Sequence, residues 1–369
     1  MGNMVEWKKL GDICDIIRGN GVQKTDFVEK GVGCIHYGQI YTHYGPFTYT
    51  TNKFVSKEVF EKARKASKGD IIMTDTSENV EDICKSVAYL GEEDIAVSNH
   101  ALILKHKQNP KFLTYSTLTD SFLIQKKKYV VGAKVSSIKP EYLAQIKIYL
   151  PSLSEQTRIV GILDTFTASI ENLKQQIAER RKQYDHYRDQ LIDLEGKEGV
   201  EMKTVQDICK LERGVRVVKK ELQAKGLIPV YQNSLTPLGY YDKTNFSENT
   251  PFVICAGAAG EIGFSTIPFW AADDCTCLVC SHSVVSKFVY YKLLVKQLSL
   301  KSQVRKASVP RLSKDVIGRL SIPVPSLQEQ SRIVSILDTF EASIANLEAQ
   351  LKEREKQYEY YRNKLLTFE

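Results

Sequence analysis

The sequence predicts an α+β protein in which two globular domains sit at the ends of an antiparallel two-helix coiled coil. Three observations predict this class. A 45-residue segment occurs twice with 28 identical positions, both copies carry a heptad pattern, and the regions between the copies show almost no alignable identity. The expected boundaries are a first globular domain at 1–150, a first helix at 151–195, a second globular domain at 196–324 and a second helix at 325–369.

Each copy of the repeat begins as a capped helix. A serine follows a proline and is followed three residues later by a glutamate, as Ser152 with Glu155 and as Ser326 with Glu329. In such a capping box the serine oxygen accepts a free backbone N–H and the glutamate reaches back to the serine N–H. Gly196 follows the first copy as a stop signal.

The interior of each copy predicts a coiled-coil seam. Apolar residues recur at alternating steps of four and three, which is the spacing that winds two helices around each other. The predicted seam residues are Ile159, Leu163, Phe166, Ile170, Leu173 and Ile177 in the first copy and Ile333, Leu337, Phe340, Ile344, Leu347 and Leu351 in the second. The simplest partner for either apolar stripe is the other copy.

The direction of the two helices depends on the globular segment between them. If the ends of that segment lie close together, as is usual for compact domains, the helices run antiparallel; if they lie far apart, the helices run parallel. We favour the antiparallel arrangement, which brings Arg180 near Phe340 and Arg354 near Phe166. Either arginine could make a cation–π contact there or extend to water.

The two globular halves share recognisable sequence only near the ends of each segment. Asp12-Ile13-Cys14 with Arg18-Gly19 matches Asp207-Ile208-Cys209 with Arg213-Gly214 at an offset of 195. Runs of β-favouring residues predict strands at Val32–Tyr37, Asp70–Met73, Ala101–Leu104, Val230–Gln232, Phe252–Cys255 and Cys275–Cys280. Helices are expected at Phe112–Lys126 and Lys287–Leu298.

Eight cysteines in a chain of 369 residues do not suggest a small disulfide scaffold. With no apolar leader at the start we expect reduced thiols and a cytoplasmic location, and no run approaches the length of a membrane helix. Cys275, Cys277, Cys280 and His282 could be zinc ligands, but a second knuckle is missing and a buried strand is favoured.

Sequence signatures of catalysis are missing. The chain has no phosphate-binding G-x-x-x-x-G-K-[ST], no H-E-x-x-H and no G-x-S-x-G. The glycines from Gly257 to Gly263 could form a cofactor loop, but a strand rather than a helix is expected to follow, so a hairpin is favoured. We therefore expect no enzymatic activity, no metal and no cofactor bound by this chain.

Basic residues precede each repeated helix and suggest contact with a polyanion, although such runs are usually solvated surface. The net charge of +7 permits this partner without demanding it. The candidate phosphate-binding and base-reading residues are Lys126, Lys127, Lys128, Lys134, Lys301, Gln303, Arg305, Lys306 and Arg311. Further candidate readers are Tyr37, Gln39, Tyr41 and His43 in the first half and Gln232, Asn233, Tyr240 and Tyr241 in the second.

The duplicated pattern resembles the DNA-specificity subunit of type I restriction–modification enzymes. The resemblance rests on Gly132-Ala-Lys-Val-Ser-Ser-Ile138, on Leu150-Pro151 with Glu155-Gln156, on their counterparts Ala307–Leu312, Val324-Pro325 and Glu329-Gln330, and on Trp7–Ile13. It covers the whole chain twice. The second half departs from it in having Lys306 where the first has Gly132.

The resemblance implies that each half is a target-recognition domain for one half of a bipartite, asymmetric site in double-stranded DNA. It implies that the helices set the spacing and dock two modification subunits, which hold S-adenosylmethionine, and that two restriction subunits use ATP and Mg. The specificity subunit itself is non-catalytic. Two alternatives remain at this point: a coiled-coil protein scaffold without DNA specificity, and an enzyme that uses the loop from Gly257 to Gly263.

Overall fold

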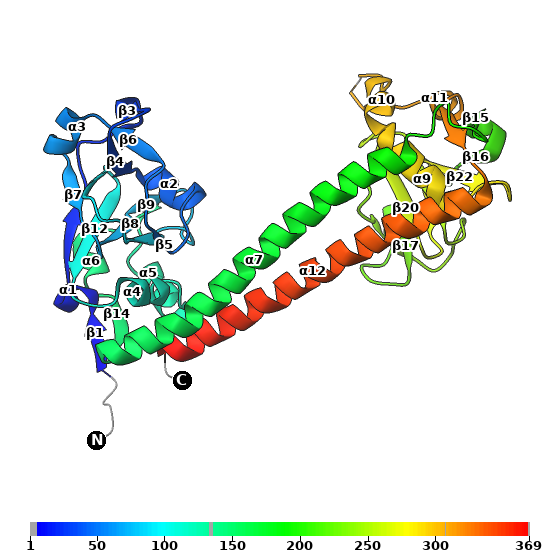
Figure 1. Cartoon of the computed structure of the whole chain (residues 1–369). Helices are drawn as coiled ribbons and strands as arrows, with labels where there is room; N and C mark the ends of the chain where they lie inside the picture. The colour runs from blue at the N-terminus through cyan, green and yellow to red at the C-terminus, as the bar shows by residue number, and fades with distance from the viewer. Residues whose placement is uncertain (1–5, 133–135, 307, 368–369) are drawn as a thin grey trace. The chain divides into compact units, whose positions relative to one another are not determined.

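The computed structural model describes residues 6–132, 136–306 and 308–367, and these form two compact units. Unit 1 comprises the chain up to Lys174 together with the end of the chain from Gln350, and unit 2 comprises Gln175–Ala349. Each unit therefore holds one globular domain and parts of both long helices, α7 (Leu153–Ile192) and α12 (Leu327–Thr367) (Figure 1). Across the described ranges, no helix is both long and apolar enough to cross a membrane.

The globular part of unit 1 is built on two five-stranded sheets, ordered β2-β12-β8-β10-β5 and β3-β6-β4-β11-β7. The strands are β1 Glu6–Lys9, β2 Cys14–Arg18, β3 Phe27–Val28, β4 Val32–Ile35, β5 Phe47–Thr48, β6 Lys53–Val55, β7 Arg64–Ala66, β8 Ile71–Thr74, β9 Thr76–Ser77, β10 Ser86–Tyr89, β11 Ile95–Val97, β12 Ala101–His106, β13 Ser136–Ser137 and β14 Lys147–Leu150. The helices are α1 Leu10–Ile13, α2 Tyr37–Thr42, α3 Lys57–Lys62, α4 Pro110–Ser116, α5 Asp120–Lys127 and α6 Pro140–Leu143, with a 3-10 turn at Lys24–Asp26.

The sheet β2-β12-β8-β10-β5 of unit 1 is buried on both faces. Alternate residues of a strand point to opposite faces, so Ile71 and Leu104 join a core with helix α4 and the start of α7, whereas Ile72 and Ile103 join a core with the second sheet. The continuous apolar runs in β8 and β12 follow from this double burial.

The globular part of unit 2 has a four-stranded sheet, β16-β22-β19-β20, and a three-stranded sheet, β18-β17-β21. The strands are β15 Glu201–Thr204, β16 Cys209–Arg213, β17 Ile228–Tyr231, β18 Gly239–Tyr241, β19 Thr250–Ile254, β20 Ile262–Ser265, β21 Trp270–Ala271, β22 Cys275–Cys280 and β23 Ser321–Val324. The helices are α8 Val205–Ile208, α9 Ser286–Val295, α10 Gln297–Ser302 and α11 Lys314–Gly318, with a 3-10 turn at Lys219–Glu221. Its larger sheet repeats the order β2-β12-β8-β10 of unit 1.

The chain enters and leaves each globular domain on paired strands. In unit 1, β1 pairs antiparallel with β14, and in unit 2, β15 pairs antiparallel with β23. The second pairing places the chain just after α7 beside the chain just before α12. The domain termini are therefore neighbours, which is the condition that predicted antiparallel helices.

The two long helices do run antiparallel within each unit. In unit 1 the ring of Phe166 stacks on Tyr361 at 5.4 Å, while Lys174, two turns later, pairs with the earlier residue Glu355. In unit 2, Arg181 bonds Glu348 and the later Tyr184 bonds the earlier Glu341. All twelve predicted seam residues are buried or half-buried, so the heptad prediction is confirmed.

The capping boxes are half confirmed. The hydroxyls of Ser152 and Ser326 accept the N–H groups of Glu155 and Glu329 at 3.4 and 3.3 Å. The two glutamate carboxylates are instead bound by the arginine three residues further along each helix at 2.6–2.8 Å. The guanidinium offers two parallel N–H donors, which compete well with a single backbone N–H.

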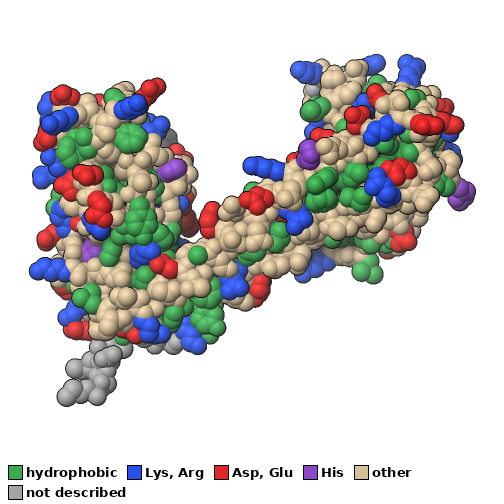
Figure 2. All heavy atoms as spheres, viewed as in Figure 1, with side chains coloured by type: hydrophobic (Ala, Val, Ile, Leu, Met, Phe, Trp, Pro, Cys, Tyr) green, Lys and Arg blue, Asp and Glu red, His purple; other side chains and the backbone are tan. Residues whose placement is uncertain are grey.

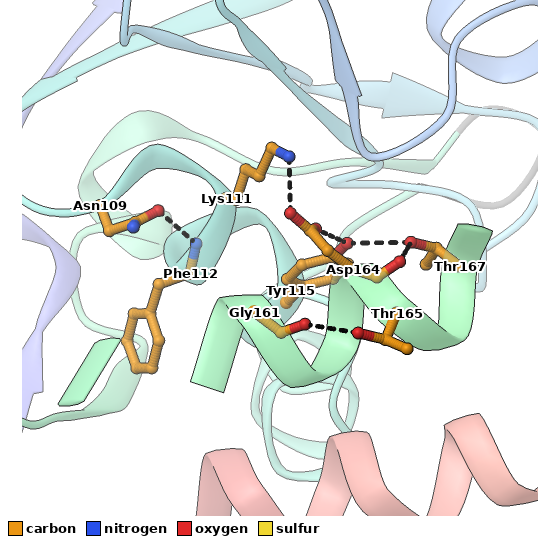
Figure 3. A network of polar contacts seen from close by, with 8 residues as sticks. All are labelled: Asn109, Lys111, Phe112, Tyr115, Gly161, Asp164, Thr165 and Thr167. Atoms are coloured by element: carbon orange, nitrogen blue, oxygen red, sulfur yellow. Dashed lines mark hydrogen bonds and ion pairs between the residues drawn. The ribbon is translucent and has the colours of Figure 1, made fainter. Parts of the chain in front are cut away.

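The same polar joint attaches each globular domain to its long helix. In unit 1 the carboxylate of Asp164 on α7 accepts bonds from Tyr115 and Lys111 of α4, both at 2.7 Å (Figure 3). Asn109 caps α4 by accepting the Phe112 N–H at 3.2 Å (Figure 3). In unit 2, Asp338 of α12 is bound in the same way by Tyr291 and Lys287 of α9, both at 2.7 Å.

Most predicted elements of the domains are confirmed with shifted ends, and two are corrected. Tyr37 begins helix α2 instead of ending a strand, because the side chains of His36 and Gln39 cap that helix. The helix expected at Phe112–Lys126 is two helices, since the hydroxyl of Thr119 accepts the Phe122 N–H and starts a second one.

Candidate nucleic-acid interface

The two domains place the same three strand ends side by side. In unit 1 the register pairs Arg18 of β2 with Leu102 of β12, and Ala101 with Thr74 at the end of β8. In unit 2 the register pairs Arg213 with Thr276, and Cys275 with Ile254. The repeated Arg-Gly pair thus lies at the same end of the sheet in both halves. We call this group of three adjacent strand ends the edge of each unit.

In unit 1 this edge holds a buried carboxylate beneath two exposed basic side chains. Asp75 follows β8, and its side chain is 0% exposed. Its Oδ2 accepts a 2.6 Å hydrogen bond from the Arg18 guanidinium, and its Oδ1 lies 3.7 Å from His100 Nδ1. The side chains of Arg18 and His100 are 59% and 58% exposed. Among the described residues, Oδ1 of Asp75 has no hydrogen-bond partner.

The backbone around this group is fixed by several contacts. A Cβ on Gly19 would meet the Ser98 carbonyl oxygen at 2.3 Å, so only glycine allows this approach. The side chain of Asn99 accepts the Gly21 N–H at 3.1 Å. His100 has φ of 63°, a conformation that non-glycine residues rarely adopt and that is often found at functional sites.

The equivalent edge of unit 2 carries different chemistry. Cys255 takes the position of Asp75, because its N–H donates to the Asp274 carbonyl as that of Asp75 donates to His100. Burial raises the pKa of the Cys255 thiol, so the thiol is neutral at pH 7. The guanidinium of Arg213 bonds the Asp273 carbonyl at 2.7 Å in place of a carboxylate.

The loops that precede the long helices close over these edges. Ile138 donates to the Asp75 carbonyl at 3.0 Å, and Leu312 donates to the Cys255 carbonyl at 2.9 Å. In unit 2 the loop is closed by a bridge between Arg305 and Arg311, both exposed, beside a cavity of about 450 Å³. The loops therefore bring a second set of side chains to each edge.

Two predicted DNA contacts are corrected. Lys126 is 2% exposed, and its ammonium donates to the carbonyls of Glu81 and Ile83 at 2.7 and 2.6 Å. Burial lowers its pKa. Gln39 is 9% exposed; its carbonyl accepts the His36 N–H and its amide donates to Asn52. Both side chains are bonded internally and cannot reach a nucleic acid in this conformation.

The other predicted phosphate contacts lie at the surface. Lys127 and Lys128 are exposed at the end of α5, and Lys127 lies 3.8 Å from Glu81. Lys301 is exposed and pairs with Glu261 at 2.6 Å. Gln303 and Lys306 are exposed in the loop with Arg305 and Arg311. Lys134 lies outside the described residues.

The predicted readers divide between the edges and other surfaces. The ring of Tyr37 contacts His100 edge-on at 5.5 Å, so it belongs to the edge of unit 1. Gln232 reaches Asp274 at 3.4 Å and belongs to the edge of unit 2. The exposed residues His43 and Asn233 remain predictions, as do three half-buried tyrosines, Tyr41, Tyr240 and Tyr241.

Neither unit shows a single basic patch on the face drawn in Figure 2, where Lys and Arg alternate with Asp and Glu.

The cysteine cluster forms a strand, as expected. Cys275 and Cys277 lie buried in β22, and burial raises the pKa of both thiols. No group of three potential metal ligands occurs within the described ranges. Gly257 and Gly260 lie in the loop that joins β19 to β20 as a hairpin, as expected, and Gly263 lies in β20. Neither feature supports the enzyme alternative.

Reasoning from the sequence missed Asp75 and His100 and gave Arg18 no role. Basic runs directed attention to lysines, whereas the edge uses single residues from three strands. The repeated Arg-Gly pair was the one available signal, since a repeat between dissimilar regions marks a common structural element.

This arrangement defines a protein with two equivalent but differently equipped surfaces, as expected for a DNA-specificity protein. The chain belongs to the type I restriction modification DNA specificity domain family, whose model matches residues 4–180 and 197–356. The role of the family is DNA sequence specificity, and the fold and the repeated domains agree with it.

Individual specificity subunits are also similar to this chain in sequence and in fold. A Haemophilus influenzae protein provisionally named as a type I restriction enzyme specificity subunit is 26% identical over 411 aligned positions, covering 100% of this chain and 96% of that protein. The crystal structure of the S subunit of a type I restriction–modification system from M. genitalium shares the fold, with a TM-score of 0.68, 18% identity and coverage of 99% and 97%. A structure that concerns complex assembly and conformational transition of the type I restriction–modification system has a TM-score of 0.62, 16% identity and coverage of 98% and 97%.

Proposed function

We propose that this chain is the non-catalytic specificity subunit of a type I restriction–modification complex and that each domain reads one half of a bipartite, asymmetric DNA site. One observation carries the proposal. The edges of the two units have the same backbone pairing but different side chains. Cys255 stands where unit 1 has Asp75, and Asp274 stands where unit 1 has His100. Different side chains on equivalent frames would read different base sequences.

The repeated helices support docking of two copies of one partner. The starts of the two helices carry the same ion pair, Arg158–Glu155 in the first copy and Arg332–Glu329 in the second. Two matching helix starts suit two equal modification subunits. In the proposal these hold S-adenosylmethionine, two restriction subunits supply the ATP- and Mg-dependent activity, and the assembly works in the cytoplasm.

The experiment is a gel shift with the chain and its modification subunits on duplexes that carry the target site, which is first mapped as the sequence methylated in cells that express these subunits. Binding should be specific, should weaken steeply as salt rises, and should lose affinity when either half-site is scrambled. Binding that is indifferent to sequence would contradict the proposal and favour the alternative of a protein scaffold without DNA specificity.

A further inference from the structure

The edge of unit 1 contains an exposed arginine, Arg18, that is oriented by the buried carboxylate of Asp75. The guanidinium of Arg18 spends one of its five N–H donors on Asp75 Oδ2 at 2.6 Å, and 59% of its side chain remains exposed. Asp75 is fully buried and is held by its own backbone bonds to His100 and Ile138. The carboxylate therefore anchors one end of the guanidinium and restricts its orientation without covering it.

Such a pair suits a base edge better than a phosphate. A phosphate contact gains mainly from net positive charge, and the charge of Arg18 is largely offset by Asp75. Recognition of guanine needs two parallel N–H donors aimed at O6 and N7, and a guanidinium whose orientation is restricted by an anchoring carboxylate favours this aim. The fixed loop from Gly19 to Gly21, tied to Asn99, removes the backbone freedom that would blur the direction.

The second half provides an internal comparison. Arg213 occupies the equivalent register position, but Cys255 replaces the acid, and among the described residues the guanidinium bonds the Asp273 carbonyl. Because a neutral carbonyl holds a guanidinium more weakly than a carboxylate does, Arg213 is less firmly directed. The two equivalent arginines thus differ in how firmly the guanidinium is held, and this firmness decides how well it can read a base.

We propose that Arg18 reads a guanine in the half-site recognised by the first domain and that Asp75 is the positioning residue that aims it. This inference rests on the proposed function, and it adds the base and the side chains that recognise it.

The test uses the full chain with its modification subunits and the mapped site. Each guanine of the first half-site is replaced in turn by 7-deazaguanine, which keeps base pairing but lacks the N7 acceptor. Wild type should lose about 10- to 100-fold in affinity at one guanine. Arg18→Ala combined with Asp75→Asn, which avoids leaving a buried charge unpaired, should bind both duplexes equally. Asp75→Asn alone should reduce the discrimination while retaining part of it.

Lys107→Ala is the matched control, since Lys107 is exposed just beyond the other end of β12. It should discriminate as wild type does. Recognition of the second half-site and of the other positions of the first half-site should stay intact in every variant, which also reports that both domains are folded. Full discrimination by the double variant would overturn the inference. So would an equal loss of affinity for all sequences with a shallower salt dependence, which indicates a phosphate contact. Absence of any bipartite site for wild type would instead overturn the proposed function.

Discussion

The guanidinium carbon of Arg180 lies 5.9 Å from the ring centroid of Phe340 on the neighbouring helix. Arg354 and Phe166 form the same contact in unit 1 at 5.8 Å. Tyr184 and Tyr187 also pack on Phe340, at 6.5 and 5.4 Å. In each unit a cation and aromatic rings thus meet at one seam position of α7 and α12, and this contact fixes how far one helix is shifted along the other.

The ring of Phe340 should therefore contribute more to the free energy of unfolding than an aliphatic side chain of similar volume would. Phe340→Ala should lower the free energy of unfolding by about 2–3 kcal/mol, because it removes a half-buried ring and its contacts. Phe340→Leu should cost about 1 kcal/mol, since it keeps most of the volume but loses the ring interactions. Urea denaturation of both variants measures this; equal losses would show that the ring itself contributes nothing.

The polar joint between domain and helix gives a second prediction. Tyr291→Phe should destabilise unit 2 by about 1–3 kcal/mol, because Asp338 loses a 2.7 Å bond from a buried hydroxyl. Tyr115→Phe should do the same in unit 1 through Asp164. Hydrogen exchange resolved along the chain should place each loss in its own unit. A loss spread evenly over both units in either variant would contradict a local joint.

The lengths and faces of the long helices could be predicted because heptads and caps are local in sequence. Strands β8, β12 and β22 could be found because each contains a short run of mostly apolar residues. The edge of unit 1 could not be predicted, since Arg18 and Asp75 are 57 residues apart and meet only through the register of three strands. The run at Lys126 misled because a row of lysines does not reveal that one of them points inward.

Two glycines should respond in opposite ways to alanine. Gly161 lies in α7 with nothing within 4 Å of an added Cβ, so Gly161→Ala should stabilise the chain by about 0.5–1 kcal/mol. At Gly19 the added Cβ would lie 2.3 Å from a carbonyl oxygen, so Gly19→Ala should destabilise it by about 1–3 kcal/mol. Thermal unfolding of the two variants compares them; a neutral Gly19→Ala would show that the edge is not tightly packed.

Lys292 gives a prediction about pH. It is 2% exposed and donates to the carbonyl of Ile192 at the end of α7, and burial lowers its pKa from 10.5 to about 8. Between pH 8 and 10.5 the unfolded chain holds the proton more tightly than the folded chain, so the free energy of unfolding should rise with pH. We expect wild type to gain about 2–3 kcal/mol over this window relative to Lys292→Met.

Lys296→Met is the control, since Lys296 lies one turn further on and its side chain is 40% exposed. Urea denaturation at pH 7.5 and pH 10 compares the three proteins. Curves for wild type and Lys292→Met that stay parallel would show that Lys292 keeps its proton in the folded chain.

The central claim is that two domains on equivalent frames read two different half-sites. Mapping the methylated adenines in DNA from cells that express this chain with its modification subunits tests it most directly. We predict one asymmetric motif made of two specific parts separated by a spacer of constant length, with methylation in both parts. A single uninterrupted motif, or methylation without a motif, would contradict the account.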